Sequence, residues 1–248
     1  MFAIIGGSGL AKLSTLEAPR RQVMRTPYGE PSGALTFGRV AGAEVVFLAR
    51  HGYGHTLAPH EINYRANLWA LRELKVEGVV SVATVGGIRS DMGPGTLVVP
   101  DQIIDYSHSR KATFFEGSEM PVIHVDFTEP YTPALRQRLL RAAAACGEAV
   151  IDGGVYACTQ GPRLETAAEI ERIARDGGDM VGMTGMPEAA LAKELGLAYA
   201  TIAVVVNSAA GRGSSRDGIP LETIGAVINP AMERVKAILG YAVVSDDS

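Results

Sequence analysis

The chain has 248 residues, 47% of them hydrophobic, and a formal net charge of −4 at pH 7 without any block of like charges. A basic patch is absent, so a nucleic-acid partner is not expected, and no stretch approaches the roughly 18 apolar residues of a membrane helix. The two cysteines, Cys146 and Cys158, are too few for a disulfide framework and lack metal-ligand spacing. The start, MFAIIGGSG, has no basic region or cleavage site of a signal peptide, so we expect a cytoplasmic protein with no membrane partner.

Short apolar runs alternate with helical patterns in the first half of the chain. Strands are predicted at residues 2–5, 34–40, 44–50, 78–88 and 96–100, the second and third of them as a pair. A helix is predicted from about Pro59, because Tyr64, Leu68 and Leu71 recur at three- and four-residue intervals.

The second half continues the alternation. Helices are predicted at residues 132–146, 165–175, 187–196 and 221–239, and strands at 153–163, 179–185 and 198–206. Such alternation predicts an α/β fold with a mixed, mostly parallel central sheet flanked by helices. We expect a single domain over residues 1–248, with VSDDS (244–248) as a loose tail.

Polar residues follow several predicted strands: Ser8, Arg50 and His51, Thr84, Met183 and Thr184, and Asn207. Ligands of open α/β sheets bind outside the carboxyl ends of the strands, so these side chains could share one site. The GGSG turn could bind an anion through backbone N–H groups, and the guanidinium fork of Arg50 suits phosphate. Each feature alone also has a structural explanation: Asn207 could satisfy a turn, and Glu165 could stabilise the start of a helix. His55 and His60 have no carboxylate cluster nearby in the sequence, so a metal site is not expected.

Four segments together are similar to a known family. IIGGSGL, LARHGYGHTLAPHEINYRANLWAL, QGPRLET and MTGMPEAALAKELGLAYATIAVVVN resemble the trimeric purine nucleoside phosphorylases, and look most like their methylthioadenosine phosphorylase branch. The similarity runs from residue 4 to about residue 237. It implies a purine nucleoside phosphorylase-like fold, a homotrimer, and reversible phosphorolysis of a purine nucleoside. Inorganic phosphate is then a co-substrate, and neither a metal nor an organic cofactor is used.

The resemblance also implies roles for individual residues. Phosphate binding falls to Ser8, Arg50, His51, Ala83, Thr84 and Thr184. The ribose faces Met183, and the base faces Asn207, Ser208, Ala209 and Glu165, with Leu164 where an aromatic residue is usual. His124 matches a histidine that reaches the site of the neighbouring subunit. Asn207 is in addition the expected catalytic residue, because its amide can stabilise charge on the departing purine.

The departures from the family pattern concern the base. Adenine-cleaving members carry Asp at the positions of Asn207 and Ala209 and a small hydroxyl residue at that of Glu165. The branch that cleaves hypoxanthine and guanine nucleosides carries Glu and Asn, as this chain does. A 6-oxopurine presents N1–H to the Glu165 carboxylate and O6 or N7 to the Asn207 amide, whereas adenine would leave the carboxylate without a donor. We therefore expect a 6-oxopurine leaving group.

The prediction for the 5′ substituent of the sugar depends on the segment after Asn207. No histidine follows Asn207, although the inosine- and guanosine-cleaving branch uses one for the 5′-hydroxyl. The segment 217–227 instead offers Ile219, Leu221 and Ile224, an apolar wall suited to a methylthio group. The combination predicts 5′-methylthioinosine as substrate.

Other hypotheses stay open. The chain could be an adenine-preferring methylthioadenosine phosphorylase, a general inosine and guanosine phosphorylase, or a nucleotide-binding module without activity. A nicotinamide-dependent oxidoreductase is disfavoured, because GGSGLAKL lacks the GxGxxG spacing.

Overall fold

The computed structural model describes residues 1–10, 12–118 and 121–244, so residues 245–248 of the predicted tail lie outside the described residues. The described strands are β1 (Phe2–Gly6), β2 (Glu17–Gln22), β3 (Leu35–Val40), β4 (Ala43–Ala49), β5 (Val79–Gly87), β6 (Leu97–Val99), β7 (Gln102–Asp105), β8 (Ile151–Asp152), β9 (Val155–Cys158), β10 (Met180–Gly182) and β11 (Tyr199–Ser208). The described helices are α1 (Tyr64–Glu73), α2 (Pro133–Ala145), α3 (Ala167–Arg175), α4 (Glu188–Glu194) and α5 (Ile224–Val244), with 3₁₀ turns at Gly213–Ser215 and Leu221–Thr223.

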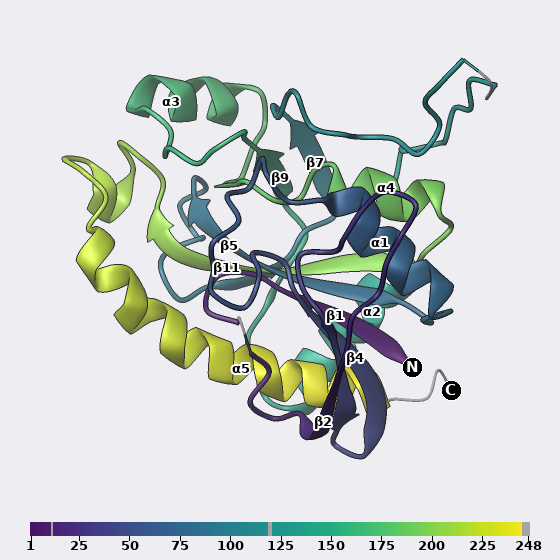
Figure 1. Cartoon of the computed structure of the whole chain (residues 1–248). Helices are drawn as coiled ribbons and strands as arrows, with labels where there is room; N and C mark the ends of the chain where they lie inside the picture. Colours follow the sequence, from purple (N-terminus) through teal and green to yellow (C-terminus); the bar gives the residue numbers. More distant parts are fainter. Residues whose placement is uncertain (11, 119–120, 245–248) are drawn as a thin grey trace.

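All of these strands belong to one sheet (Figure 1). Its main path is β2-β3-β4-β1-β5-β10-β9-β7, and β11 branches from β5 to pair with β6, which pairs with β8. The β1 strand is parallel to β4 and β5, and β11 is parallel to β5. The β2-β3-β4 meander and the β10–β5 and β11–β6 pairs are antiparallel. The predicted mixed, mostly parallel sheet is confirmed.

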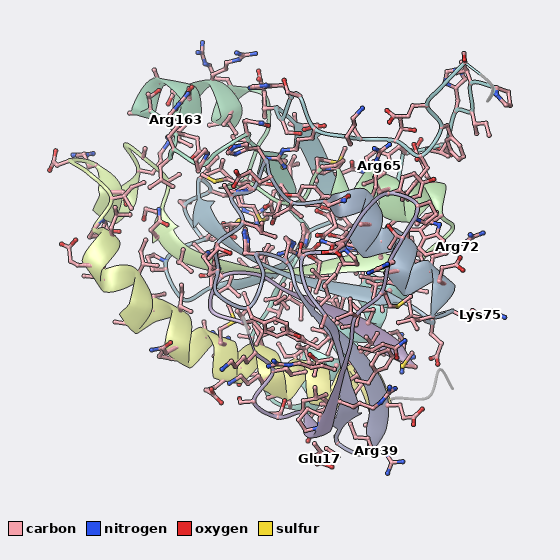
Figure 2. The ribbon with its side chains drawn as sticks, in the orientation of Figure 1. Glu17, Arg39, Arg65, Arg72, Lys75 and Arg163 are labelled. Carbon is pink, nitrogen blue, oxygen red and sulfur yellow. The ribbon has the colours of Figure 1, made fainter. Side chains whose placement is uncertain are left out.

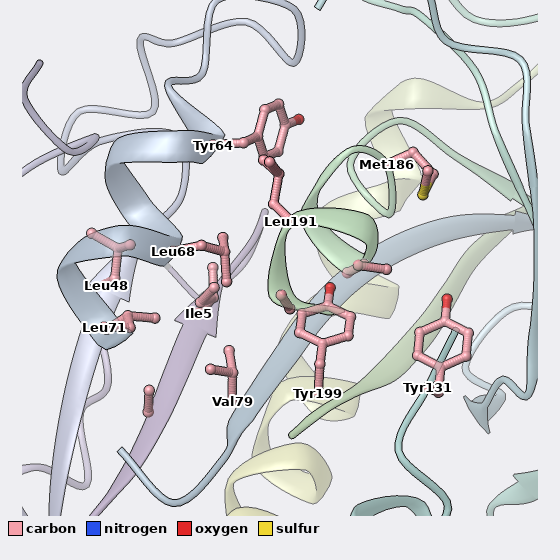
Figure 3. Close-up of a cluster of buried hydrophobic side chains, with 14 of the residues drawn as sticks. Ile5, Leu48, Tyr64, Leu68, Leu71, Val79, Tyr131, Met186, Leu191 and Tyr199 are labelled. Carbon is pink, nitrogen blue, oxygen red and sulfur yellow. The ribbon is translucent and has the colours of Figure 1, made fainter. Parts of the chain in front are cut away.

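Helices cover both faces of the sheet. Side chains alternate along β1, so Ala3 and Ile5 join one apolar cluster while Phe2 and Ile4 join the other. The first cluster is covered by α1 and α4, as Figure 3 shows for Leu68 and Leu191 over the strands. The second cluster is covered by α2 and the long helix α5. Burial on both faces explains the continuous apolar runs that the sequence shows at the central strands.

Several element boundaries differ from the predictions. Helix α1 starts at Tyr64 rather than near Pro59, because the Asn63 side chain caps it by accepting the Ala66 N–H. Strand β2 was not predicted, since its sequence EAPRRQ is exposed along its whole length and carries no apolar alternation. Helix α5 begins later and ends later than residues 221–239, after a 3₁₀ turn.

Charged side chains lie at separate places around the molecule, as the labelled residues in Figure 2 illustrate. Glu17 and Arg39 face each other across the β2–β3 pair, far from Arg163 beside α3. Among the described residues, no helix combines the length and apolarity needed to cross a membrane.

Candidate active site

A cavity of about 260 Å³ lies where β1, β4 and β11 end beside the last third of β5. The six predicted phosphate-binding residues all line it: Ser8, Arg50, His51, Ala83, Thr84 and Thr184. The predicted substrate-binding residues that line it are Leu164, Glu165, Met183, Asn207, Ala209, Ile219 and Leu221. Residues that are far apart in the sequence therefore line one cavity.

Two predicted site residues lie elsewhere. Ser208 does not line the cavity, and its hydroxyl is 3.2 Å from the Ser214 Oγ. Neighbouring strand residues point to opposite sides, and Asn207 lies on the side of the cavity, so the predicted contact of Ser208 with the base stays a prediction. His124 is exposed and does not line the cavity of its own chain. Its predicted role in a neighbouring subunit stays a prediction.

Met183 and Thr184 reach the cavity by a route that the sequence did not indicate. They follow β10, which runs antiparallel to β5, with Met180 beside Gly87 and Val181 beside Gly86. The strand therefore points back toward the middle of β5 and delivers Thr184 near Thr84. Both residues line the cavity although their strand is antiparallel to β5.

Arg50 is completely buried and is held by two points of contact to a buried carboxylate. Its Nε donates to Glu188 Oε2 at 2.7 Å, and its Nη2 donates to Glu188 Oε1 at 2.9 Å. Nη2 also donates to Ser81 Oγ at 2.5 Å, and Nη1 donates to the Val82 carbonyl at 3.0 Å. The expectation of a guanidinium fork open to phosphate is corrected, because Glu188 occupies the fork and these contacts leave one Nη1–H.

The protonation states of Arg50 and His51 follow from burial and from the ion pair between Arg50 and Glu188. Burial alone would lower the pKa of Arg50, but the Glu188 carboxylate more than offsets it and the pKa is raised. Burial, reinforced by the Arg50 guanidinium, lowers the pKa of His51 to about 4. His51 is therefore neutral at pH 7, and its Nδ1 lies 2.8 Å from the Leu57 carbonyl, which makes Nδ1 the donor. Its other ring nitrogen is then an acceptor.

Asn207 enters the cavity because of a bulge in β11. Val205 pairs with Val85, but the next pair is Asn207 with Gly86, so Val206 is an extra residue. Val206 and Asn207 both line the cavity, which neighbours on a regular strand would not do. The Asn207 Nδ2 donates to the Ser208 carbonyl at 2.6 Å, which fixes the amide plane. Part of the amide thus serves the local backbone, while the side chain as a whole lines the cavity.

Glu165 also lines the cavity, and it does not cap helix α3. The α3 cap is made by Thr166, whose Oγ1 accepts the Glu169 N–H at 3.1 Å, and by Glu169, which accepts the Thr166 N–H at 2.7 Å. Glu165 instead accepts a hydrogen bond from Thr159 Oγ1 at 2.6 Å. The helix-start explanation for Glu165 is therefore not supported, and a carboxylate is available at the cavity wall.

The apolar end of the cavity extends further than the sequence indicated. Ile224 and Ile228 line it together with Ile219 and Leu221, and Val181 lines it on the side of Met183. Ile224 and Ile228 are four residues apart at the start of α5, a helical spacing that could have extended the predicted wall to Ile228. Glu188 was missed because a Glu directly after Pro187 also fits an ordinary helix start.

Two further observations concern possible metal ligands and the buried thiol. In residues 1–10, 12–118 and 121–244, no group of three or more His, Cys, Asp or Glu side chains is placed to hold a metal. Cys158 is buried, and burial raises its pKa to about 12, so it is a thiol rather than a nucleophilic thiolate at neutral pH. The lining of the cavity thus combines hydroxyl groups and backbone donors, apolar side chains, the amide of Asn207 and the carboxylate of Glu165.

Comparison with known proteins shows the family of this chain. The phosphorylase superfamily model matches residues 1–243. A protein of Pseudomonas syringae pv. tomato named "Probable S-methyl-5'-thioinosine phosphorylase" is 53% identical over 239 residues, which are 96% of each chain. The "6-oxopurine nucleoside phosphorylase" of Pyrococcus furiosus is 50% identical over 220 residues, 87% of this chain and 82% of that one.

The fold is similar to solved structures as well. A methylthioadenosine phosphorylase from Schistosoma mansoni in complex with adenine superposes with a TM-score of 0.92 at 31% identity, covering 98% of this chain and 90% of that one. The family match over nearly the whole length, relatives at about half identity and a shared fold lead to one conclusion: this chain belongs to the phosphorylase superfamily.

Proposed function

We propose that the protein catalyses phosphorolysis of S-methyl-5′-thioinosine, giving hypoxanthine and 5-methylthioribose 1-phosphate. The observation that carries the proposal is the presence of Glu165 and Asn207 in one cavity that also has the apolar wall of Ile219, Leu221 and Ile228. The carboxylate and amide complement a 6-oxopurine, and the wall complements a methylthio group. The names of the relatives from Pseudomonas and Pyrococcus, which refer to methylthioinosine and to 6-oxopurines, support the same assignment.

In this proposal phosphate lies at the end of the cavity with Ser8, Thr84 and Thr184, near the backbone of the Gly7 turn and the last Nη1–H of Arg50. A phosphate oxygen attacks C1′ while the bond between C1′ and N9 breaks, through an oxocarbenium-like state as in glycoside cleavage. The bonding pair leaves with the purine. Asn207 stabilises the developing negative charge near N7 and O6 by donating a hydrogen bond.

The proposal includes features that go with the reaction. No metal or organic cofactor takes part, since the nucleophile is phosphate itself. The chain acts as a cytoplasmic homotrimer in which His124 of one subunit reaches the sugar end of the next site. Support for this last point comes from the segment around His124, where Val122 is 80% exposed and Ile123 is 45% exposed, an apolar surface suited to a second copy.

The test is phosphate-dependent release of free base from methylthioinosine, methylthioadenosine and inosine, measured side by side at equal concentrations. We expect methylthioinosine to have the highest kcat/KM by at least about tenfold. A preference for methylthioadenosine would mean that Glu165 does not read the base. A preference for inosine would mean that the apolar wall does not recognise the methylthio group. Absence of turnover with all three nucleosides would overturn the proposal altogether.

A further inference from the structure

The Glu165 carboxylate lies between two cavities. One is the candidate active site, and the other, of about 440 Å³, is lined by Arg163 and Arg172 among others. Glu165 is the residue that contributes to both linings. Arg163 is already paired with Glu169 through two hydrogen bonds, and Arg172 is paired with Asp176, so neither arginine fixes the Glu165 side chain. A flexible carboxylate at the border of two cavities therefore needs another restraint to present an oxygen to the active-site cavity.

The side chain of Thr159 restrains the Glu165 carboxylate through a hydrogen bond. Its Oγ1 is 2.6 Å from Glu165 Oε1 and 3.3 Å from the Gly182 carbonyl. The hydroxyl has a single hydrogen, and the shorter distance to the charged acceptor assigns that hydrogen to Glu165. Thr159 lines the second cavity but not the active-site cavity, so it would affect a bound base only through Glu165.

The backbone of Thr159 is itself held firmly. Its N–H donates to the Gly182 carbonyl at 2.8 Å, at the end of β10. Its carbonyl accepts from Arg110 Nη2 at 3.2 Å, and Arg110 Nη1 also donates to the Met183 carbonyl at 2.8 Å. The Thr159 backbone is thus tied to the strand end that carries Met183 into the active site, and its hydroxyl is held in a fixed place beside the Glu165 carboxylate.

We infer that Thr159 is a positioning residue that orients Glu165 for recognition of the 6-oxopurine N1–H, an inference that rests on the proposed function. A threonine hydroxyl on Oε1 fixes the carboxylate plane and leaves Oε2 for the base. If the Glu165 side chain is already ordered before the ligand binds, the entropic cost of ordering it does not reduce the binding free energy. Selectivity for the 6-oxo over the 6-amino group therefore depends on a hydroxyl that does not touch the base.

The first test replaces the hydroxyl by a methyl group in Thr159→Val. We expect kcat/KM for methylthioinosine to fall by about tenfold to a hundredfold, the range for losing a hydrogen bond to a charged group. Activity on methylthioadenosine should fall far less, because adenine has no N1–H to lose. Thr159→Ser keeps the donor and should restore the wild-type ratio. In parallel, calorimetric titration with phosphate present should show weaker hypoxanthine binding in the Val variant and unchanged adenine binding.

Two further variants separate this role from a general structural one. Thr36→Val makes the same change at a buried hydroxyl 2.6 Å from Tyr53, away from the cavity, and should leave the substrate ratio unchanged. In a Glu165→Gln background, Thr159→Val should produce no further loss of selectivity, since residues that act through one group are not additive. Equal losses on both substrates, or additive losses in the double variant, would overturn the inference. A wild-type enzyme without 6-oxopurine preference would instead overturn the proposed function.

Discussion

Arg50 and Glu188, which are 138 positions apart in sequence, form a two-point ion pair in which each residue is 0% exposed. The Tyr199 hydroxyl donates to Glu188 Oε1 at 2.8 Å, so the carboxylate has a further partner beyond the guanidinium. The pair is neutral overall and links the residue after β4 to the first residue of α4, and Arg50 lines the cavity. Arg50 is therefore in place before any anion arrives.

Removing the carboxylate should destabilise the fold. In Glu188→Gln the Arg50 charge is left buried without a counter-ion, a change that typically costs about 3–5 kcal/mol. We expect the urea-unfolding free energy to fall by that order and the KM for phosphate to rise. Glu171→Gln serves as control, because its pair with Arg212 is exposed and should cost under about 1 kcal/mol. Similar small losses in both variants would show that the buried pair is not important for stability.

Exchanging the amide of Asn207 for a carboxylate should impair 6-oxopurine cleavage. In Asn207→Asp the donor to the Ser208 carbonyl disappears, and a negative charge meets the charge that develops on the purine. We expect kcat on methylthioinosine to drop by about 100-fold or more, the scale for losing one donor at a developing anion. Steady-state kinetics on methylthioinosine and methylthioadenosine would check this. Undiminished methylthioinosine activity without any gain on methylthioadenosine would remove Asn207 from the mechanism.

Adding a hydroxyl to the apolar wall should shift sugar preference. Ile219→Thr keeps the branched shape but offers a polar group, so a methylthio substituent loses apolar contact while a 5′-hydroxyl gains a partner. We expect the ratio of kcat/KM for methylthioinosine over inosine to fall by about tenfold. Ile151→Thr on β8, half-buried and remote from the cavity, is the matched control and should leave the ratio unchanged. If the ratio of kcat/KM values is unaltered in Ile219→Thr, the methylthio group does not contact Ile219.

His51 should make stability depend on pH in one direction. Its folded pKa is lowered from 6.5 to about 4 by burial and by Arg50, so the unfolded chain takes up the proton first as the pH falls. The contribution of His51 is fully present above pH 6.5 and is lost progressively between 6.5 and about 4. In the variant His51→Asn, the new amide can still donate to the Leu57 carbonyl but does not titrate.

Urea unfolding of wild type and His51→Asn at pH 7.5 and pH 5 would measure this effect. The carboxylates common to both proteins cancel in the comparison. We expect wild type to lose more stability than the variant on going to pH 5, so that the gap between them narrows or reverses. A gap that is the same at both pH values would mean that His51 titrates normally in the folded protein.

Local patterns in the sequence predicted the alternation of elements, whereas most of the cavity lining was predicted from the family resemblance. Apolar runs with turn residues after them locate β1, β4, β5 and β11 and the polar residues at their ends. Strand β2 lacks such a pattern, and its place is decided by pairing with β3. Apolar periodicity in the sequence cannot reveal a strand that buries no side chains.

The parts that escaped prediction depend on contacts between distant segments or on residue counts. Glu188 has the sequence context of an ordinary helix start, and only the fold brings it against Arg50. Thr159 falls inside the predicted strand 153–163, whereas it follows β9, and its bond to Glu165 depends on how the loop between them closes. Ser208 was placed on the base by its position in the family pattern, whereas the strand turns its hydroxyl toward Ser214.

The extra residue in β11 sets which side chains of this strand reach the cavity. In a strand of the same length that paired regularly, Val206 would stand opposite Gly86, and alternation would carry Asn207 to the opposite face. The bulge takes up one residue, so Asn207 pairs with Gly86 and lines the cavity beside Val206. The pairing offset is therefore inherited information as much as residue identity, and a strand that lost the bulge but kept its length would present a different side chain at this wall.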